Sequence, residues 1–124
     1  MPLPTGGWTI NSNGNQGTLL IGAVDPHGKL VDSSGNFSSA LRIPGGPPGP
    51  GEIRGFWDEG SQKLTFMTID GPPDAYTGFL FQDSFRMPGI TGGVGYTLTG
   101  YFESFRKGTA DRPLFGWYAQ IGVP

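Results

Sequence analysis

The sequence predicts an all-β protein, a single domain over residues 1–124 that folds as an eight-stranded antiparallel up-and-down β-barrel. Three observations support this class. Short apolar runs bounded by turn residues recur along the whole chain, whereas no eleven-residue window holds a helical apolar stripe free of glycine or proline. Glycine and proline supply 23 and 12 of the 124 residues, yet aromatic residues make up 13%. A glycine-centred phrase also recurs four times.

That phrase is an apolar residue, a spacer, a glycine and two bulky residues. It occurs as IRGFW at 53–57, YTGFL at 76–80, LTGYF at 98–102 and LFGWY at 114–118. A glycine inside an aromatic strand weakens it and marks a bend, a bulge or a close backbone approach. Four of them indicate strands that must curl repeatedly, as closing a sheet into a barrel demands. A two-sheet sandwich would also have about eight strands, but it gives no special reason for these glycines.

The first two strands are expected at 6–12 and 17–24. Asn13 and Gly14 between them are a strong signal for a two-residue hairpin turn. The second strand ends at residues 25–28, where a proline presets a turn and a glycine supplies positive φ.

A third strand is expected over 29–43, broken near residues 33–35. Residues 44–51 read PGGPPGPG and cannot donate hydrogen bonds to a sheet ladder, so this segment is expected to be an exposed loop. A fourth strand over 52–58 and a fifth over 62–69 then form a hairpin through a tight turn.

The last three strands are expected at 74–82, 95–104 and 112–122, with a longer connection at 83–94. Eight strands with short links favour a meander. A closed barrel of that size has an interior wide enough for side chains or one small ligand, and closure removes exposed strand edges.

Composition excludes several classes of function. The net charge is −2 and Arg106 and Lys107 are the only adjacent cations, so there is no positive footprint for nucleic acid. No apolar run approaches ~20 residues, which argues against a membrane-spanning helix. The chain has no cysteine and no visible signal peptide, so a cytoplasmic location is the default expectation. With one histidine and no cysteine, neither a metal site nor a cofactor is expected.

Several motifs resemble the avidin and streptavidin family. They are GGWT at 6–9, the GKL turn at 28–30, GNFSSA at 35–40, LTGYFES at 98–104 and FGW at 115–117, although the last two fall near the C-terminus here. The resemblance implies an avidin-like barrel that holds a small molecule between its open strand ends.

The family's biotin-binding positions fall on residues of this sequence, so the resemblance implies a ligand site. Where those residues differ from the family's, it implies that high-affinity biotin binding is lost. Phe37 stands where the family has a tyrosine, and Gly122 or Val123 stands where it has an aspartate. A site that hydrogen-bonds its ligand loses orders of magnitude when a polar group is unmatched. The candidate ligand-binding residues are Trp8, Asn11, Phe37, Ser39, Phe66, Tyr76 and Tyr101.

Adjacent aromatic residues in a strand face opposite sides of the sheet, so half of them should lie on the outer wall. Exposed apolar area of that size marks an interface. The residues expected there, as contacts of a homo-oligomer, are Trp57, Phe102, Trp117 and Tyr118.

The principal hypothesis is therefore a non-enzymatic barrel that binds a small ligand. The alternative is a module that binds a protein or a glycan through exposed aromatics and the loops at 11–16 and 25–36. An enzyme using His27, Asp58, Glu59 or Glu103 is the third hypothesis; acids at strand ends more often face water.

Overall fold

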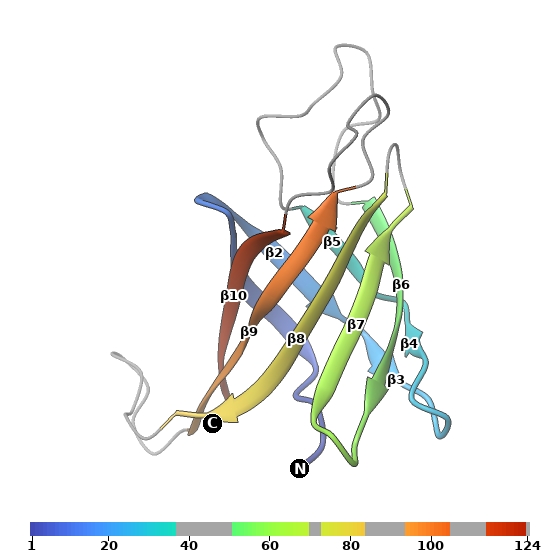
Figure 1. Ribbon diagram of the computed structural model, residues 1–124. Helices are drawn as coiled ribbons and strands as arrows, with labels where there is room; N and C mark the ends of the chain where they lie inside the picture. The colour runs from blue at the N-terminus through green and yellow to red at the C-terminus, as the bar shows by residue number, and fades with distance from the viewer. Residues whose placement is uncertain (37–50, 70–72, 84–93, 105–113, 124) are drawn as a thin grey trace.

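The computed structural model describes residues 1–36, 51–69, 73–83, 94–104 and 114–123 (Figure 1). All regular structure in these ranges is β-structure. The strands are β1 (Gly6–Ser12), β2 (Asn15–Ile21), β3 (Ala23–Val24), β4 (Leu30–Val31), β5 (Ser34–Asn36), β6 (Gly51–Asp58), β7 (Lys63–Thr68), β8 (Asp74–Gln82), β9 (Val94–Ser104) and β10 (Leu114–Val123).

The sheet closes on itself. Its strand order is β1-β10-β9-β8-β7-β6-β5-β2, and β2 returns to β1, with every pairing antiparallel. The closing contact runs from Thr9 opposite Gln120 to Ser12 opposite Trp117. Figure 1 shows the tilted strands enclosing one interior. The predicted eight-stranded antiparallel barrel is confirmed.

The second and third predicted strands are each interrupted. Gly22 separates β2 from β3, and a Cβ there would lie 2.3 Å from the carbonyl oxygen of Asp32. Asp32 has a φ of 51°, a left-handed conformation that breaks the run between β4 and β5. The segment 23–31 therefore forms a small hairpin, β3 with β4, beside the barrel. The rest of the predicted third strand, beyond Asn36, lies outside the described residues.

Ser33 joins the barrel at this interruption. Its hydroxyl accepts a hydrogen bond from the Gly22 N–H at 3.2 Å and donates to the Val31 carbonyl at 3.2 Å. Its own carbonyl accepts from the Ile53 N–H at 3.2 Å. β5 pairs with β6 over only two residue pairs. The hydrogen bonds of the buried Ser33, which precedes β5, therefore add to the connection between β2 and β6.

The interior is filled by apolar side chains that alternate along each strand. Trp8, Ile10, Leu19, Leu64 and Leu98 are among those with no measurable exposure. The segment before β1 lies against one end of this core, where Leu3 is buried and the Trp8 indole Nε1 donates to the Pro4 carbonyl at 3.1 Å. Figure 1 places the N-terminus at the end of the barrel shown lowest; the opposite end carries the β1–β2 turn.

Most of the recurring glycines allow atoms of neighbouring strands to lie where a Cβ would otherwise be. A Cβ on Gly100 would lie 2.0 Å from the Thr77 carbonyl oxygen, and one on Gly55 would lie 2.1 Å from that of Thr65. A Cβ on Gly78 would lie 2.4 Å from the indole of Trp117. Gly116 has open space beside it. Three of the four glycines are therefore required by their neighbours, and the fourth phrase is not equivalent to the others.

Candidate functional site

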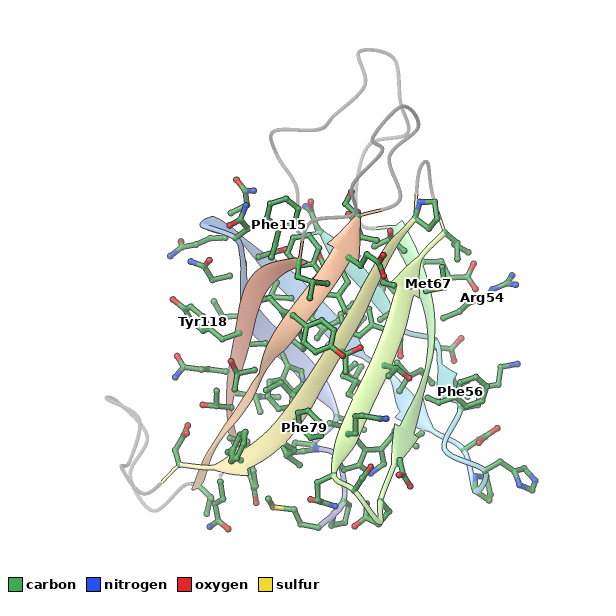
Figure 2. All side chains as sticks on the ribbon, viewed as in Figure 1. Arg54, Phe56, Met67, Phe79, Phe115 and Tyr118 are labelled. Atoms are coloured by element: carbon green, nitrogen blue, oxygen red, sulfur yellow. The ribbon has the colours of Figure 1, made fainter. Side chains whose placement is uncertain are left out.

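A row of four aromatic rings crosses the interior toward the end with the β1–β2 turn. Phe66, Tyr76, Phe102 and Phe115 lie on β7, β8, β9 and β10, and each is the direct cross-strand partner of the next. The Phe66 and Tyr76 rings are stacked with centroids 4.6 Å apart, as are those of Tyr76 and Phe102. Phe115 continues the row at 5.3 Å from Phe102 (Figure 2). The row exists because alternation places all four side chains inside.

Trp117 packs edge-on against this row. Its ring lies 5.7 Å from Phe66 and 5.6 Å from Tyr76, both close to perpendicular. Its indole Nε1 lies 3.1 Å from the carbonyl oxygens of both Thr77 and Tyr101, so one N–H is shared by two strands. The space that it occupies is the space that Gly78 leaves empty.

A buried hydroxyl pair lies on top of the aromatic row. The Tyr76 Oη and the Ser12 Oγ are 2.7 Å apart and are both buried. Burial raises the pKa of the Tyr76 phenol to about 12, with a smaller contribution from the charge of Asp74, while the Ser12 hydrogen bond acts in the opposite direction. Tyr76 therefore stays neutral at physiological pH and keeps its proton for hydrogen bonding.

Ser104 holds a second hydroxyl at the same end. It follows Phe102 by two residues on β9 and so faces the same side of the sheet. Its side chain is 7% exposed, and its buried Oγ has no hydrogen-bond partner among the residues that the structure describes. Its cross-strand partner is Asp74, whose N–H donates to the Thr68 Oγ1 at 2.9 Å. An aromatic row with hydroxyls above it, one of them unpaired, is the candidate site.

Three predicted ligand-site residues lie in the interior, namely Trp8, Phe66 and Tyr76, and the last two belong to the candidate site. Asn11 faces outward and its Oδ1 accepts from the Gly14 N–H at 2.8 Å, which stabilises the hairpin turn. Phe37 and Ser39 lie outside the described residues.

The prediction that Tyr101 faces the interior is wrong. Tyr101 is 46% exposed on the outer wall, and its neighbour Phe102 faces inward.

The predicted outer-wall residues are corrected in the same way. Trp57, Phe102 and Trp117 are all buried inside the barrel, and only Tyr118, at 47% exposure, lies outside. The cause is phase. In the first three phrases the glycine and the second bulky residue face inward, whereas in β10 the first bulky residue does. When two adjacent side chains are both aromatic, polarity does not tell which one is buried.

The residues that sequence reasoning missed are Ser12, Ser104, Phe115 and, as interior groups, Phe102 and Trp117. A usable signal was present. Counting in twos from Tyr76 leads through Gly78 to the buried Leu80, and counting from Leu98 leads to Phe102 and Ser104. A serine at an inward position beyond an aromatic residue marks the site.

The titratable groups of the enzyme hypothesis lie apart. Asp58 ends β6 and Glu59 begins the turn after it, at the end of the barrel away from Glu103, which pairs with Leu114 at the start of β10. The Ser61 hydroxyl lowers the pKa of Asp58, and hydrogen bonds from the N-terminal ammonium and the Trp57 indole lower that of Glu59. His27 is exposed in a turn organised by the Asp25 Oδ1, which accepts from its N–H at 2.9 Å.

Two depressions are formed by described residues outside the barrel interior. One, of about 410 Å³, lies between β4 and β6 and includes Lys29, Asp32 and Arg54. The other, of about 510 Å³, lies beside the His27 turn and includes Leu3 and Trp57. Neither includes a residue of the aromatic row.

Within the described ranges, no helix has the length and apolar character needed to cross a membrane.

Comparison with protein-family models, with curated proteins and with solved structures finds no match for this chain. The function of the chain therefore has to be inferred from the chemistry of its own residues.

Proposed function

We propose that this protein is a non-enzymatic barrel that binds a small molecule at the end of its interior where the aromatic row meets Ser12, Tyr76 and Ser104. The proposal includes an avidin-like architecture, as the sequence motifs imply, with a ligand other than tightly bound biotin. The observation that supports this best is the buried Ser104 hydroxyl, which has no partner within the described part of the chain.

An unpaired buried hydroxyl is costly. Leaving such a group without a hydrogen bond costs about 1–3 kcal/mol, so folded proteins rarely keep one without a reason. A ligand that supplies a hydrogen-bond partner to the Ser104 Oγ recovers that energy. Its apolar part would lie against the rings of Phe102 and Phe115, the two aromatic residues nearest to Ser104 along their strands.

The polar groups of the site set the chemistry of the ligand. Ser12, Tyr76 and Ser104 are uncharged hydroxyls at physiological pH, because the ordinary pKa of tyrosine already lies near 10 and burial raises that of Tyr76 to about 12. Hydroxyls both donate and accept, so they suit a neutral polar group such as an amide, urea or hydroxyl on a flat apolar body. We expect millimolar biotin to have little effect, because Phe37 cannot supply the family's tyrosine hydroxyl.

Replacing Ser104 with alanine tests the site before any ligand is known. Ser104→Ala removes an unsatisfied polar group, so we expect the ligand-free protein to keep its stability or to gain up to about 1 kcal/mol. Ser12→Ala is the matched control: it removes a buried hydrogen bond between Ser12 and Tyr76 and should cost about 1 kcal/mol. Urea unfolding measures both. If Ser104→Ala is as destabilising as Ser12→Ala, the hydroxyl is needed in the free fold and the proposal fails.

A ligand screen tests the function itself. The probes are biotin and a library of uncharged heteroaromatic amides and ureas, followed by melting temperature and by the fluorescence of Trp117, which touches the row. A hit should lose at least about tenfold in affinity in Tyr76→Phe and in Ser104→Ala. Tyr118→Phe, the same change on the outer wall, should bind normally. A hit insensitive to both site variants would exclude this end of the barrel.

A further inference from the structure

The middle of the outer surface of β8, β9 and β10 holds no charged residue. Every second residue within 77–81, 97–101 and 116–120 faces outward, and we call this set of residues the β9 wall. They are threonine, glutamine, glycine and aromatic residues, and none of them is charged. Four aromatic side chains lie among them, with exposures of 40% for Phe79, 54% for Phe81, 46% for Tyr101 and 47% for Tyr118.

The register gathers these side chains around one centre. Thr99 on β9 lies directly opposite Phe79 on β8 and Tyr118 on β10. Thr97, one step along the same face, lies opposite Phe81. Figure 2 shows Phe79 and Tyr118 on the outer side of the ribbons. Tyr101 is the diagonal neighbour of both Phe79 and Tyr118. Diagonal neighbours stand about 7–8 Å apart, within reach of aromatic side chains, so the rings and the threonines between them form one patch.

Charged residues border this wall: Lys63 on β7 lies opposite Phe79, and Glu103 follows Tyr101 by two residues on the same face of β9. Strand β6, which β7 separates from β8, exposes Glu52, Arg54 and Asp58, and the turn after it adds Glu59. Soluble surfaces usually mix both signs over about 25–35% of their residues. Loss of charge together with exposed Tyr and Phe is the composition that marks the core of a protein interface.

The area matches a stable contact. An aromatic side chain buries about 150–250 Å² when fully covered, so four half-exposed rings offer about 400 Å². A standard interface takes about 800 Å² from each partner, so the rings supply about half of it and the polar residues between and around them must supply the rest. A patch of this size on a monomer is usually functional.

A second copy of the same chain fits this wall better than an unrelated partner. In a two-fold interface each residue near the axis meets its own copy, so any charge there would face a like charge. A wall without charges meets that condition, and its β-branched and aromatic side chains can interdigitate as facing sheets do. We propose that two copies of this protein pair through their β9 walls, with Thr99 near the two-fold axis.

The experiment measures mass in solution. Wild type is examined by light scattering and sedimentation from about 1 to 100 μM, the range in which a dimer of micromolar affinity dissociates. Thr99→Arg places two like charges at the axis, and Tyr118→Arg does so beside it. Thr18→Arg is the control, since Thr18 is an exposed threonine on β2, three strands away around the barrel. Circular dichroism confirms that each variant folds.

We expect wild type and Thr18→Arg to have twice the chain mass at the upper concentrations, and the folded Thr99→Arg and Tyr118→Arg variants to have the chain mass. Two results would overturn the proposal. One is a wild type that remains monomeric throughout, which would leave the wall to a glycan or to another protein. The other is a dimer that survives both wall substitutions. Ligand binding at the barrel end is measured separately, so neither result bears on it.

Discussion

At the scale of single residues, Tyr76 connects most of the candidate site. Its ring is stacked between Phe66 and Phe102 and lies nearly perpendicular to that of Trp117. Its hydroxyl is hydrogen-bonded to that of Ser12 in the interior. The same burial that makes the stacking favourable also opposes ionisation, because a phenolate would lose its solvation. Packing and protonation state are therefore two consequences of one location.

The raised pKa of Tyr76 predicts how stability depends on pH in alkali. An unfolded tyrosine titrates near 10, and the folded one at about 12, so between these values the folded state holds a proton that the unfolded state has released. The unfolding free energy should fall as pH rises through this window, by about 2–3 kcal/mol in total. Tyr76→Phe should lack this part of the fall. Urea unfolding of both proteins at pH 9 to 12 measures the difference, and equal slopes would show that the phenol ionises freely in the folded state.

At the scale of strands, the outcome depends on which of two adjacent bulky residues faces inward. Phe56 with Trp57 and Tyr101 with Phe102 offer no contrast in polarity, so the sequence leaves their orientation open. Register decides it: Gly78 opposes Gly100, and both lie on the inner face, where their neighbours leave no room for a Cβ. The residue two positions after each glycine is then buried as well.

Alanine substitutions separate the glycines that packing requires from the one that it does not. Gly100→Ala would set a Cβ 2.0 Å from a backbone oxygen, and we expect a loss of about 3 kcal/mol or more. Gly116→Ala has open space and should be neutral or should stabilise by about 0.5 kcal/mol, because alanine restricts the unfolded chain. Chemical unfolding of the two variants checks this. Equal losses would mean that the phrase acts through strand curvature at both positions.

At the scale of the whole molecule, closure removes the free edge that an open sheet would have at β1 or β10. Four residue pairs join these strands, and β1 continues into β2 through the hairpin at Asn13 and Gly14. The weakest link is between β5 and β6, where only two pairs form and the contacts of Ser33 complete the join. The barrel is thus closed firmly at its termini and more sparingly in the middle of the chain.

Native-state hydrogen exchange should reflect that arrangement. We expect the hydrogen-bonded amides in the middle of β1 and β10 to exchange only through global unfolding, with the same opening free energy as those of β8 and β9. The amides of β3, β4 and β5 should open at lower free energy, because their ladders are short. Exchange from β1 well below the global free energy would show that the barrel opens there.

Much of the architecture could be predicted because turn chemistry is local. Asn13 with Gly14, the tight turn at 59–61 and the alternating runs placed most strands within a residue or two of their observed bounds. The break at Asp32 was predicted only approximately, because an aspartate in the left-handed region leaves no distinctive local pattern. For the site, Trp8, Phe66 and Tyr76 were predicted in the interior, but the serines were not, since a lone serine carries no signal until its neighbours across the sheet are known.

The order of short, turn-bounded apolar runs determined by itself that this chain is a β-meander, because strand propensity and turn formation depend on residues close together in the chain. Only the tertiary structure decided which face of each strand points inward, and with it the burial of Trp117, the exposure of Tyr101 and the unpaired hydroxyl of Ser104. The physical reason is that a shift of one residue in register moves every side chain of a strand to the other face. Contacts between distant strands select between those two arrangements.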